Sequence, residues 1–181
     1  MANRWVITVV GKDRPGIVAG VTKALYRLGC NLEDSAMTRL EGEFAIMLIF
    51  SSPVKATESA IRKAFNALER QLQLVAHLKR LSKAEATTPA KSGKPYRIAV
   101  YGADRAGIVF RVSDALARAG INILDVHTHR SASDSPSLYL MLLEVEVPAR
   151  VKIERLESRL HALAKTLGVE VSIHSNEAEV L

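Results

Sequence analysis

The chain contains two copies of one sequence unit, and this repeat restricts its fold more than any other feature. Residues 5–34 and residues 96–125 align without gaps and are identical at half of their positions. The identical pairs include Gly16 with Gly107 and Asn31 with Asn122. Because a repeat of this kind marks a structural unit that occurs twice, the sequence predicts two similarly folded domains.

The stretch between the two copies has a different composition from either copy. Residues 82–95 are rich in small residues, lysine and proline, and they have no apolar periodicity. Such a composition is typical of an exposed linker. We therefore expect one domain in residues 1–81, a linker in residues 82–95 and a second domain in residues 96–181.

Both copies predict the same order of elements, namely strand, helix, two strands, helix and strand. In the first copy, short β-branched and alternating apolar runs indicate the strands, and apolar residues at helical spacing indicate the helices. A tight hairpin is expected at Glu41 and Gly42. The expected elements are strands at residues 6–10, 31–40, 43–50 and 72–81, and helices at residues 17–28 and from Pro53 onward.

This order of elements predicts an α+β fold of two tandem ferredoxin-like βαββαβ units. With right-handed crossovers, each unit is an antiparallel sheet that carries both helices on one face. The opposite face of each sheet has no helix, and each unit is small. We therefore expect the units, or two chains, to pair.

Composition and charge exclude several classes of protein. No apolar run is long enough to span a membrane, and the N-terminal residues do not resemble a signal peptide. Cys30 is the single cysteine, which excludes an intrachain disulfide, and a cytoplasmic protein is expected. The net charge of +6 leaves direct DNA binding open. Because the basic residues are spread over several elements and into the linker, a solvated basic surface is the preferred interpretation.

The polar residues most suited to binding lie in the turn between the first strand and the first helix of each copy. In the first copy, Gly11 is expected to adopt a positive φ. Asp13 is expected to cap the helix, with Pro15 in its first turn. Gly16 would leave the backbone N–H groups of the helix N-terminus open to an anion such as a carboxylate. The same residues would also start a helix that binds nothing, and the sequence leaves both interpretations open.

Asn31 begins the next expected strand, and its side chain can both donate and accept hydrogen bonds. If Asn31 lies beside the turn, it could bind one end of a small zwitterion. Asp13, or Asp104 in the second copy, could then face the ammonium group of that ligand. Because Asp13 cannot both cap the helix and leave its N–H groups to a ligand, these two roles compete.

The residues of this turn and of the elements that follow it resemble a known family. DRPGIV after a strand, followed by a helix, GCNLED and an apolar hairpin, resembles the ACT domain, and DRAGIV with AGINILD resembles a second copy. The resemblance implies a βαββαβ fold, assembly through sheets or helices, and binding of amino acids or other effectors at domain interfaces. The resemblance also implies ligand-binding positions. In the first copy these are Asp13, Arg14, Pro15, Gly16, Ile17 and Asn31, and in the second copy they are Asp104, Arg105, Gly107, Ile108 and Asn122.

Two ACT copies without another domain form a narrower pattern. Residues 29–50 resemble the first domain of tandem ACT transcriptional repressors. This resemblance implies a cytoplasmic homodimer that senses an amino acid, with glycine suspected, and that binds a transcriptional activator rather than DNA. The alternative is an ACT subunit that binds and controls a metabolic enzyme. Ala106 in place of the proline and a longer second hairpin indicate that the two copies need not bind the same ligand.

The remaining polar residues and motifs give no sign of a catalytic, metal or cofactor site. His127 and His129 should point to one face of a strand, but no further ligands for zinc lie nearby, so surface or interface histidines are expected. Cys30 is expected to be a small buried apolar residue. No catalytic triad, phosphate-binding loop or dinucleotide-binding motif occurs at the required spacing. We therefore expect a non-catalytic protein without cofactors.

Overall fold

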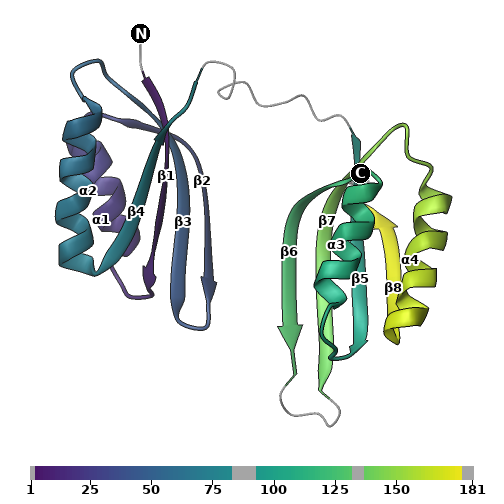
Figure 1. Cartoon of the computed structure of the whole chain (residues 1–181). Coiled ribbons are helices and arrows are strands. Elements are labelled where there is room, and N and C mark those ends of the chain that lie inside the picture. The colour runs from purple at the N-terminus through teal and green to yellow at the C-terminus, as the bar shows by residue number, and fades with distance from the viewer. Residues whose placement is uncertain (1–2, 83–92, 132–136, 177–181) are drawn as a thin grey trace, which may run out of the picture. The chain divides into compact units, whose positions relative to one another are not determined.

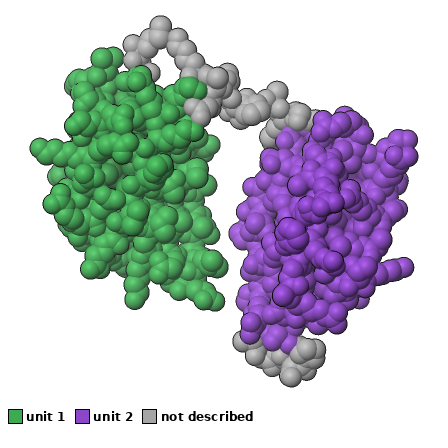
Figure 2. Space-filling model, in the orientation of Figure 1, with its two compact units in different colours: residues 1–88 green, residues 89–181 purple. Residues whose placement is uncertain are grey.

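The structure is a computed structural model that describes residues 3–82, 93–131 and 137–176. The chain divides between residues 88 and 89 into two compact units, coloured separately in Figure 2. Each unit has its own sheet, helices and apolar core (Figure 1). The α+β prediction of two tandem ferredoxin-like units is confirmed.

Unit 1 is a four-stranded antiparallel sheet with two helices on one face. The strand order is β2-β3-β1-β4, so the first strand lies inside the sheet between β3 and β4. The β2–β3 hairpin turns at Glu41 and Gly42, as predicted, and both residues have positive φ. The elements are β1 (Asn3–Lys12), α1 (Ile17–Arg27), β2 (Asn31–Leu40), β3 (Glu43–Ser52), α2 (Glu58–Leu72) and β4 (Leu74–Arg80).

The core of unit 1 lies between the sheet and the two helices. Alternate residues of β1 and β3 are buried, as expected for strands with one covered face. The helices contribute apolar residues spaced by about one turn. Each large apolar side chain buried in this way stabilises the fold by on the order of 2 kcal/mol. The largest buried side chains include Trp5, Ile7, Ile17, Leu48, Phe50 and Ile61.

One polar side chain lies within this apolar core. Ser52 is buried, and its Oγ accepts a hydrogen bond of 3.0 Å from Nε1 of Trp5. The Ser52 hydroxyl also donates to the carbonyl of Ala56 at 3.4 Å. These bonds satisfy the indole N–H away from water, where an unpaired donor would be costly.

Unit 2 repeats the same topology with the strand order β6-β7-β5-β8. Its core is also formed by one sheet face and two helices, with Ile98, Leu116 and Leu143 among the most buried residues. The predicted longer hairpin between β6 and β7 includes residues 132–136, which lie outside the described residues. The elements are β5 (Gly93–Ala103), α3 (Ile108–Arg118), β6 (Asn122–Arg130), β7 (Leu138–Pro148), α4 (Ile153–Leu167) and β8 (Val169–Ser175).

Several element bounds differ from the sequence prediction; β1 and β3, for example, are longer than expected, at Asn3–Lys12 and Glu43–Ser52. Pro53 does not open the second helix; α2 begins at Glu58, where the Thr57 hydroxyl accepts a hydrogen bond from the Ala60 N–H at 3.2 Å. The helix continues to Leu72, so β4 begins at Leu74 rather than at residue 72. Residues 93–95 of the expected linker are already part of β5, whereas residues 83–92 lie outside the described part of the chain. The domain limits at residues 81 and 96 stay predictions.

The helix-free sheet faces carry exposed apolar residues. In unit 1, Val10, Met47 and Val75 come from three neighbouring strands and are all exposed. In unit 2, Leu140 and Leu142 of β7 are exposed in the same way. Pairing through these faces stays a prediction.

Candidate functional site

Gly11, which was expected in the strand–helix turn of unit 1, is still part of strand β1. Gly11 still pairs with Phe44 on one side and Leu74 on the other. A Cβ at this position would lie 2.6 Å from Cδ2 of Leu74 and 3.1 Å from the carbonyl oxygen of Gln73. Gly11 does not have the predicted positive φ. Glycine is favoured here because a Cβ would displace the Leu74 side chain and press against the backbone of β4.

Helix α1 begins at Ile17, and Gly16 is its N-cap residue with φ of 95°. No side chain of the described residues caps this end, and the first turn contains no acidic residue. The predicted roles of Asp13 as the cap and of Pro15 in the first helical turn are therefore wrong, because Gly16 in the left-handed conformation starts the helix after both of them. A Cβ at Gly16 would meet no described heavy atom within 4 Å. The N-terminal amides of α1 are thus uncapped and lie beside open space.

The second copy has the same geometry at its turn. Gly107 is the N-cap of α3 with φ of 93°, again without a side-chain cap. A Cβ there would also have no described neighbour within 4 Å. The exposed Ala106 takes the place of Pro15, and both lie outside the helices. The sequence difference at this position therefore leaves the start of the helix unchanged.

Asp13 is directed to the hairpin instead of the helix. Its carboxylate forms an ion pair of 3.2 Å with Nη1 of Arg39, and its backbone N–H donates to the carbonyl of Gly42 at 2.7 Å. Asp104 repeats this arrangement, with Arg130 at 3.6 Å and the carbonyl of Ser137 at 2.9 Å. Each aspartate thus has a cationic partner from the same unit. It anchors the turn to the hairpin rather than presenting a free carboxylate to an ammonium group.

Arg14 has an unsatisfied polar atom in this turn. Its Nε is buried, and it has no hydrogen-bond partner among the described residues. Buried donors of this kind are rare and costly, because they lose water without gaining an acceptor. The corresponding Arg105 is exposed, and its Nη1 donates to the carbonyl of Leu167 at the end of α4, at 3.3 Å. The two arginines therefore occupy equivalent positions with different partners.

Asn31 does not lie beside the turn of its own unit. Through the strand register, Asn31 is level with Ser51 and Arg4, whereas the turn follows Lys12. Eight strand steps at about 3.3 Å each place the two sites roughly 26 Å apart. Asn122 is likewise level with Glu146 and Pro95, at the opposite end of its sheet from the turn. The structure therefore does not bring the asparagines and the turn residues of one unit together.

Ile17 and Ile108 are core residues. Both are 1% exposed, and each packs in the apolar cluster of its unit. Their side chains hold the first turn of the helix against the sheet. They position the N-terminal amides and are not accessible to a ligand.

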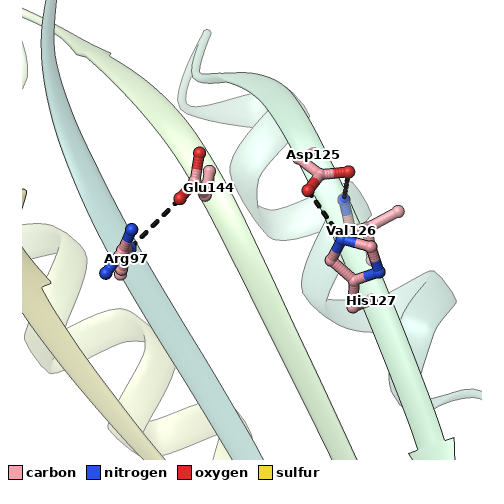
Figure 3. A network of polar contacts seen from close by, with 5 residues as sticks. All are labelled: Arg97, Asp125, Val126, His127 and Glu144. Atoms are coloured by element: carbon pink, nitrogen blue, oxygen red, sulfur yellow. Dashed lines mark hydrogen bonds and ion pairs between the residues drawn. The ribbon is translucent and has the colours of Figure 1, made fainter. Parts of the chain in front are cut away.

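A polar network lies on the helix-free face of unit 2 (Figure 3). Arg97 of β5 pairs with Glu144 of β7 at 3.1 Å, and Nε2 of His127 lies 2.8 Å from the Asp125 carboxylate. The same carboxylate accepts the backbone N–H of Val126 at 2.9 Å. His127 and His129 are exposed on β6, as predicted. Within the described ranges, no group of three or more His, Cys, Asp or Glu side chains is arranged to hold a metal ion.

Cys30 is half-buried between α1 and β2 and packs against the core of unit 1. Burial raises the pKa of the Cys30 thiol, because a thiolate there would lose solvation. This environment agrees with the predicted small apolar role. In the part of the chain that the structure describes, no helix is both long and apolar enough to cross a bilayer.

Sequence reasoning missed two features of the turn. The Arg39 partner of Asp13 comes from β2, and nothing in its sequence context signals that pairing. The unsatisfied Nε of Arg14 depends on its tertiary surroundings, so no local pattern could have indicated it. The positive φ of Gly16 was within reach, because glycine is the residue that adopts this conformation without strain.

Comparison with known proteins places both units in one family. The ACT domain model matches residues 3–79 and again residues 97–174, which confirms the predicted resemblance. The glycine cleavage system transcriptional repressor of Escherichia coli is 25% identical over 171 residues, which cover 93% of this chain and 88% of that protein.

Two solved structures match nearly the whole chain. An unknown protein from Galdieria sulphuraria is 27% identical with a TM-score of 0.80, over 97% of this chain and 99% of that one. A proposed glycine cleavage system transcriptional repressor is 21% identical with a TM-score of 0.71, over 96% of this chain and 97% of that one. The latter structure supports the fold.

Proposed function

This chain belongs to the ACT domain family, and we propose that it is an amino-acid-sensing regulator without catalytic function. The proposed ligand is a small amino acid, with glycine as the first candidate. The proposed output is contact with a DNA-binding transcriptional activator in the cytoplasm. The glycine cleavage system transcriptional repressor of E. coli, which aligns with most of this chain, supports the proposal.

The observations that carry the proposal are the uncapped N-terminus of α1 and the unsatisfied Nε of Arg14, which precedes this helix in the same turn. The first N–H groups of a helix and its positive dipole end attract a carboxylate. Gly16 presents no side chain there, and no acidic residue in the first turn competes for the site. A ligand carboxylate would give these amides an acceptor and give the Arg14 guanidinium a counter-ion.

Two sites of unequal strength follow from the same geometry. The turn of α3 also has uncapped amides at Gly107, but Arg105 already donates to the carbonyl of Leu167. Arg105 would have to give up that bond to reach a ligand, whereas Arg14 has none at Nε to lose. We therefore assign the stronger site to unit 1.

We propose that the protein is a homodimer, because Asn31 and the strand–helix turn are about 26 Å apart in one unit. One small ligand cannot contact both groups of one unit, so the asparagine would come from another unit, and we assign it to Asn31 of a second copy of the chain. Asn31 is exposed at the start of an edge strand, where a second copy has access to it. A ligand held between two copies stabilises one arrangement over others and so changes the surface available to a partner.

Calorimetric titration of the purified chain with the twenty amino acids, beginning with glycine and serine, tests this proposal. We expect saturable glycine binding in the micromolar to millimolar range and a dimer that becomes more stable with glycine in sedimentation experiments. Absence of heat across the panel would refute amino-acid sensing. If glycine binds but the protein copurifies from its own cells with a metabolic enzyme and no transcription factor, the proposed output is wrong.

A further inference from the structure

The outer surface of the helix layer in unit 1 is hollowed between α1 and α2. The groove has a volume of about 600 Å³. Small residues of both helices, including Ala19, Gly20 and Ala67, leave this space open, and Leu68 and Leu72 form part of its apolar lining. A Cβ at Gly20 would lie only 3.1 Å from Cδ1 of either leucine, so the groove reaches down to the core side chains.

Two cations line this groove, and two more lie on the other side of α2. Lys23 and Arg27 of α1 line it, and Lys63 and Arg70 lie on the outer side of α2, along a second hollow of about 510 Å³. All four are exposed, and none has a carboxylate partner within residues 3–82, 93–131 and 137–176.

The acidic residues of α2 do not neutralise these four cations. Glu58 forms an ion pair with Arg62 at 2.8 Å. The carboxylate of Glu69 accepts the backbone N–H of Ala76 at 2.7 Å, and it is therefore directed toward β4. The helix layer thus combines an apolar groove with a cationic rim, formed by Lys23 and Arg27, and with two further cations on the other side of α2.

This combination selects the kind of partner that fits. A second copy using the same face would bring the four cations against themselves, and like charges across an interface are strongly unfavourable. A nucleic acid would pair with the cations, but its phosphate backbone would not fill an apolar groove between helices. An amphipathic helix fits both features, because its apolar stripe enters the groove and acidic residues beside that stripe meet the rim.

We propose that the α1–α2 groove of unit 1 is a docking site for an acidic amphipathic helix of a protein partner. This inference rests on the proposed function only in that a protein partner exists; it does not depend on which amino acid is sensed. The attraction of the rim would also orient the partner during encounter, so the association rate should fall as salt increases.

Unit 2 provides a matched control within the same chain. Its corresponding groove, of about 640 Å³, is lined by Phe110, Arg111, Arg118 and Arg159, where unit 1 has Ala19, Gly20, Arg27 and Ala64. Asp114 takes the place of Lys23 and pairs with Arg118 at 2.9 Å. Phe110 is 71% exposed. Asp114 therefore places a negative charge where unit 1 has the cation Lys23, and this charge would repel an acidic helix at that position.

The test is a selection of helical peptides from a surface-randomised library on the full-length chain, followed by fluorescence anisotropy with the enriched peptides. We expect enriched peptides with an apolar stripe flanked by Asp and Glu. Their affinity should fall at least tenfold for Lys23→Glu/Arg27→Glu and for Ala67→Phe, which fills the groove. It should be unchanged for the control Arg111→Glu/Arg118→Glu in unit 2.

Several outcomes would overturn the inference. These are no enrichment, enriched peptides without acidic residues, or equal affinity for the unit 1 and unit 2 variants. Binding of duplex DNA that is lost in Lys23→Glu/Arg27→Glu, without peptide binding, would assign the surface to nucleic acid instead. If Ala67→Phe fails to fold by circular dichroism, the exposed charge variants still decide the question. Glycine titration of the same variants separates the two proposals, because these residues lie outside the proposed ligand site.

Discussion

Replacing Arg14 with methionine should weaken ligand binding while leaving unit 1 as stable or making it more stable. Methionine retains an unbranched apolar stem but removes the guanidinium, whose Nε is buried without a partner. In the proposed complex this guanidinium binds the ligand carboxylate. In the free protein, the same group carries an unmet desolvation cost. One substitution therefore has opposite effects on binding and on folding.

The magnitudes follow from the Arg14 environment. A hydrogen bond to a charged group contributes about 1.5–3 kcal/mol, so glycine affinity should fall roughly 10- to 150-fold. An unsatisfied buried polar atom costs about 1–3 kcal/mol. Because Arg14 as a whole is only half-buried, we expect the lower end of that range. A gain of about 1 kcal/mol would raise the unfolding midpoint of a domain of this size by roughly 4–8 °C.

The equivalent substitution in unit 2, Arg105→Met, is the control. Arg105 is exposed, and it donates to the carbonyl of Leu167 at 3.3 Å. Its removal should lower the free energy of unfolding of unit 2 by about 0.5 kcal/mol, near the low end for a single hydrogen bond. The two matched substitutions should therefore change the stability of their units in opposite directions.

Urea denaturation followed by tryptophan fluorescence measures unit 1 alone, because Trp5 is the single tryptophan of the chain. Circular dichroism of the same samples follows the unfolding of both units and so measures the change in unit 2. Calorimetry with glycine measures affinity for each variant. The reasoning would be refuted if Arg14→Met bound glycine as tightly as the unchanged protein. It would also be refuted if Arg14→Met lowered the stability of unit 1 as Arg105→Met lowers that of unit 2.

Three further predictions concern other parts of the structure. Ser52→Ala leaves the buried indole N–H of Trp5 unpaired, so it should cost unit 1 about 1–3 kcal/mol in urea denaturation, and an unchanged midpoint would contradict that hydrogen bond. The Tyr101 hydroxyl donates to Glu170, and this bond and the negative charge raise the pKa of Tyr101. The stability gained from this bond is present below pH 10 and is lost as pH rises through the raised pKa, so absorbance titration should give a lower Tyr101 pKa in Glu170→Gln. Because burial raises the pKa of Cys30, iodoacetamide should alkylate it more slowly at pH 8 than it alkylates a free cysteine, and an equal rate would contradict its burial.

The repeated fold was predictable from the sequence alone. The repeat, the strand periodicity in residues 43–50 and the helical spacing of Ile17, Val21 and Leu25 are local patterns, and local patterns decide which element forms. The hairpin at Glu41 and Gly42 was also predictable, because a glycine between two strand-like runs favours a tight turn. The start of α2 was missed although Thr57 is a good N-cap, because Pro53 is also a common signal for a helix start.

The arrangement of the candidate site, in contrast, depends on tertiary contacts. Asp13 is held by Arg39 from a strand that is distant in sequence, so it neither caps the helix nor offers a free carboxylate. Asn31 and the turn residues lie at opposite ends of one sheet. The unsatisfied Nε of Arg14 exists only because of the atoms that surround it. These features depend on contacts between residues far apart in the chain, and the spacing of residues along the sequence contains no information about such contacts.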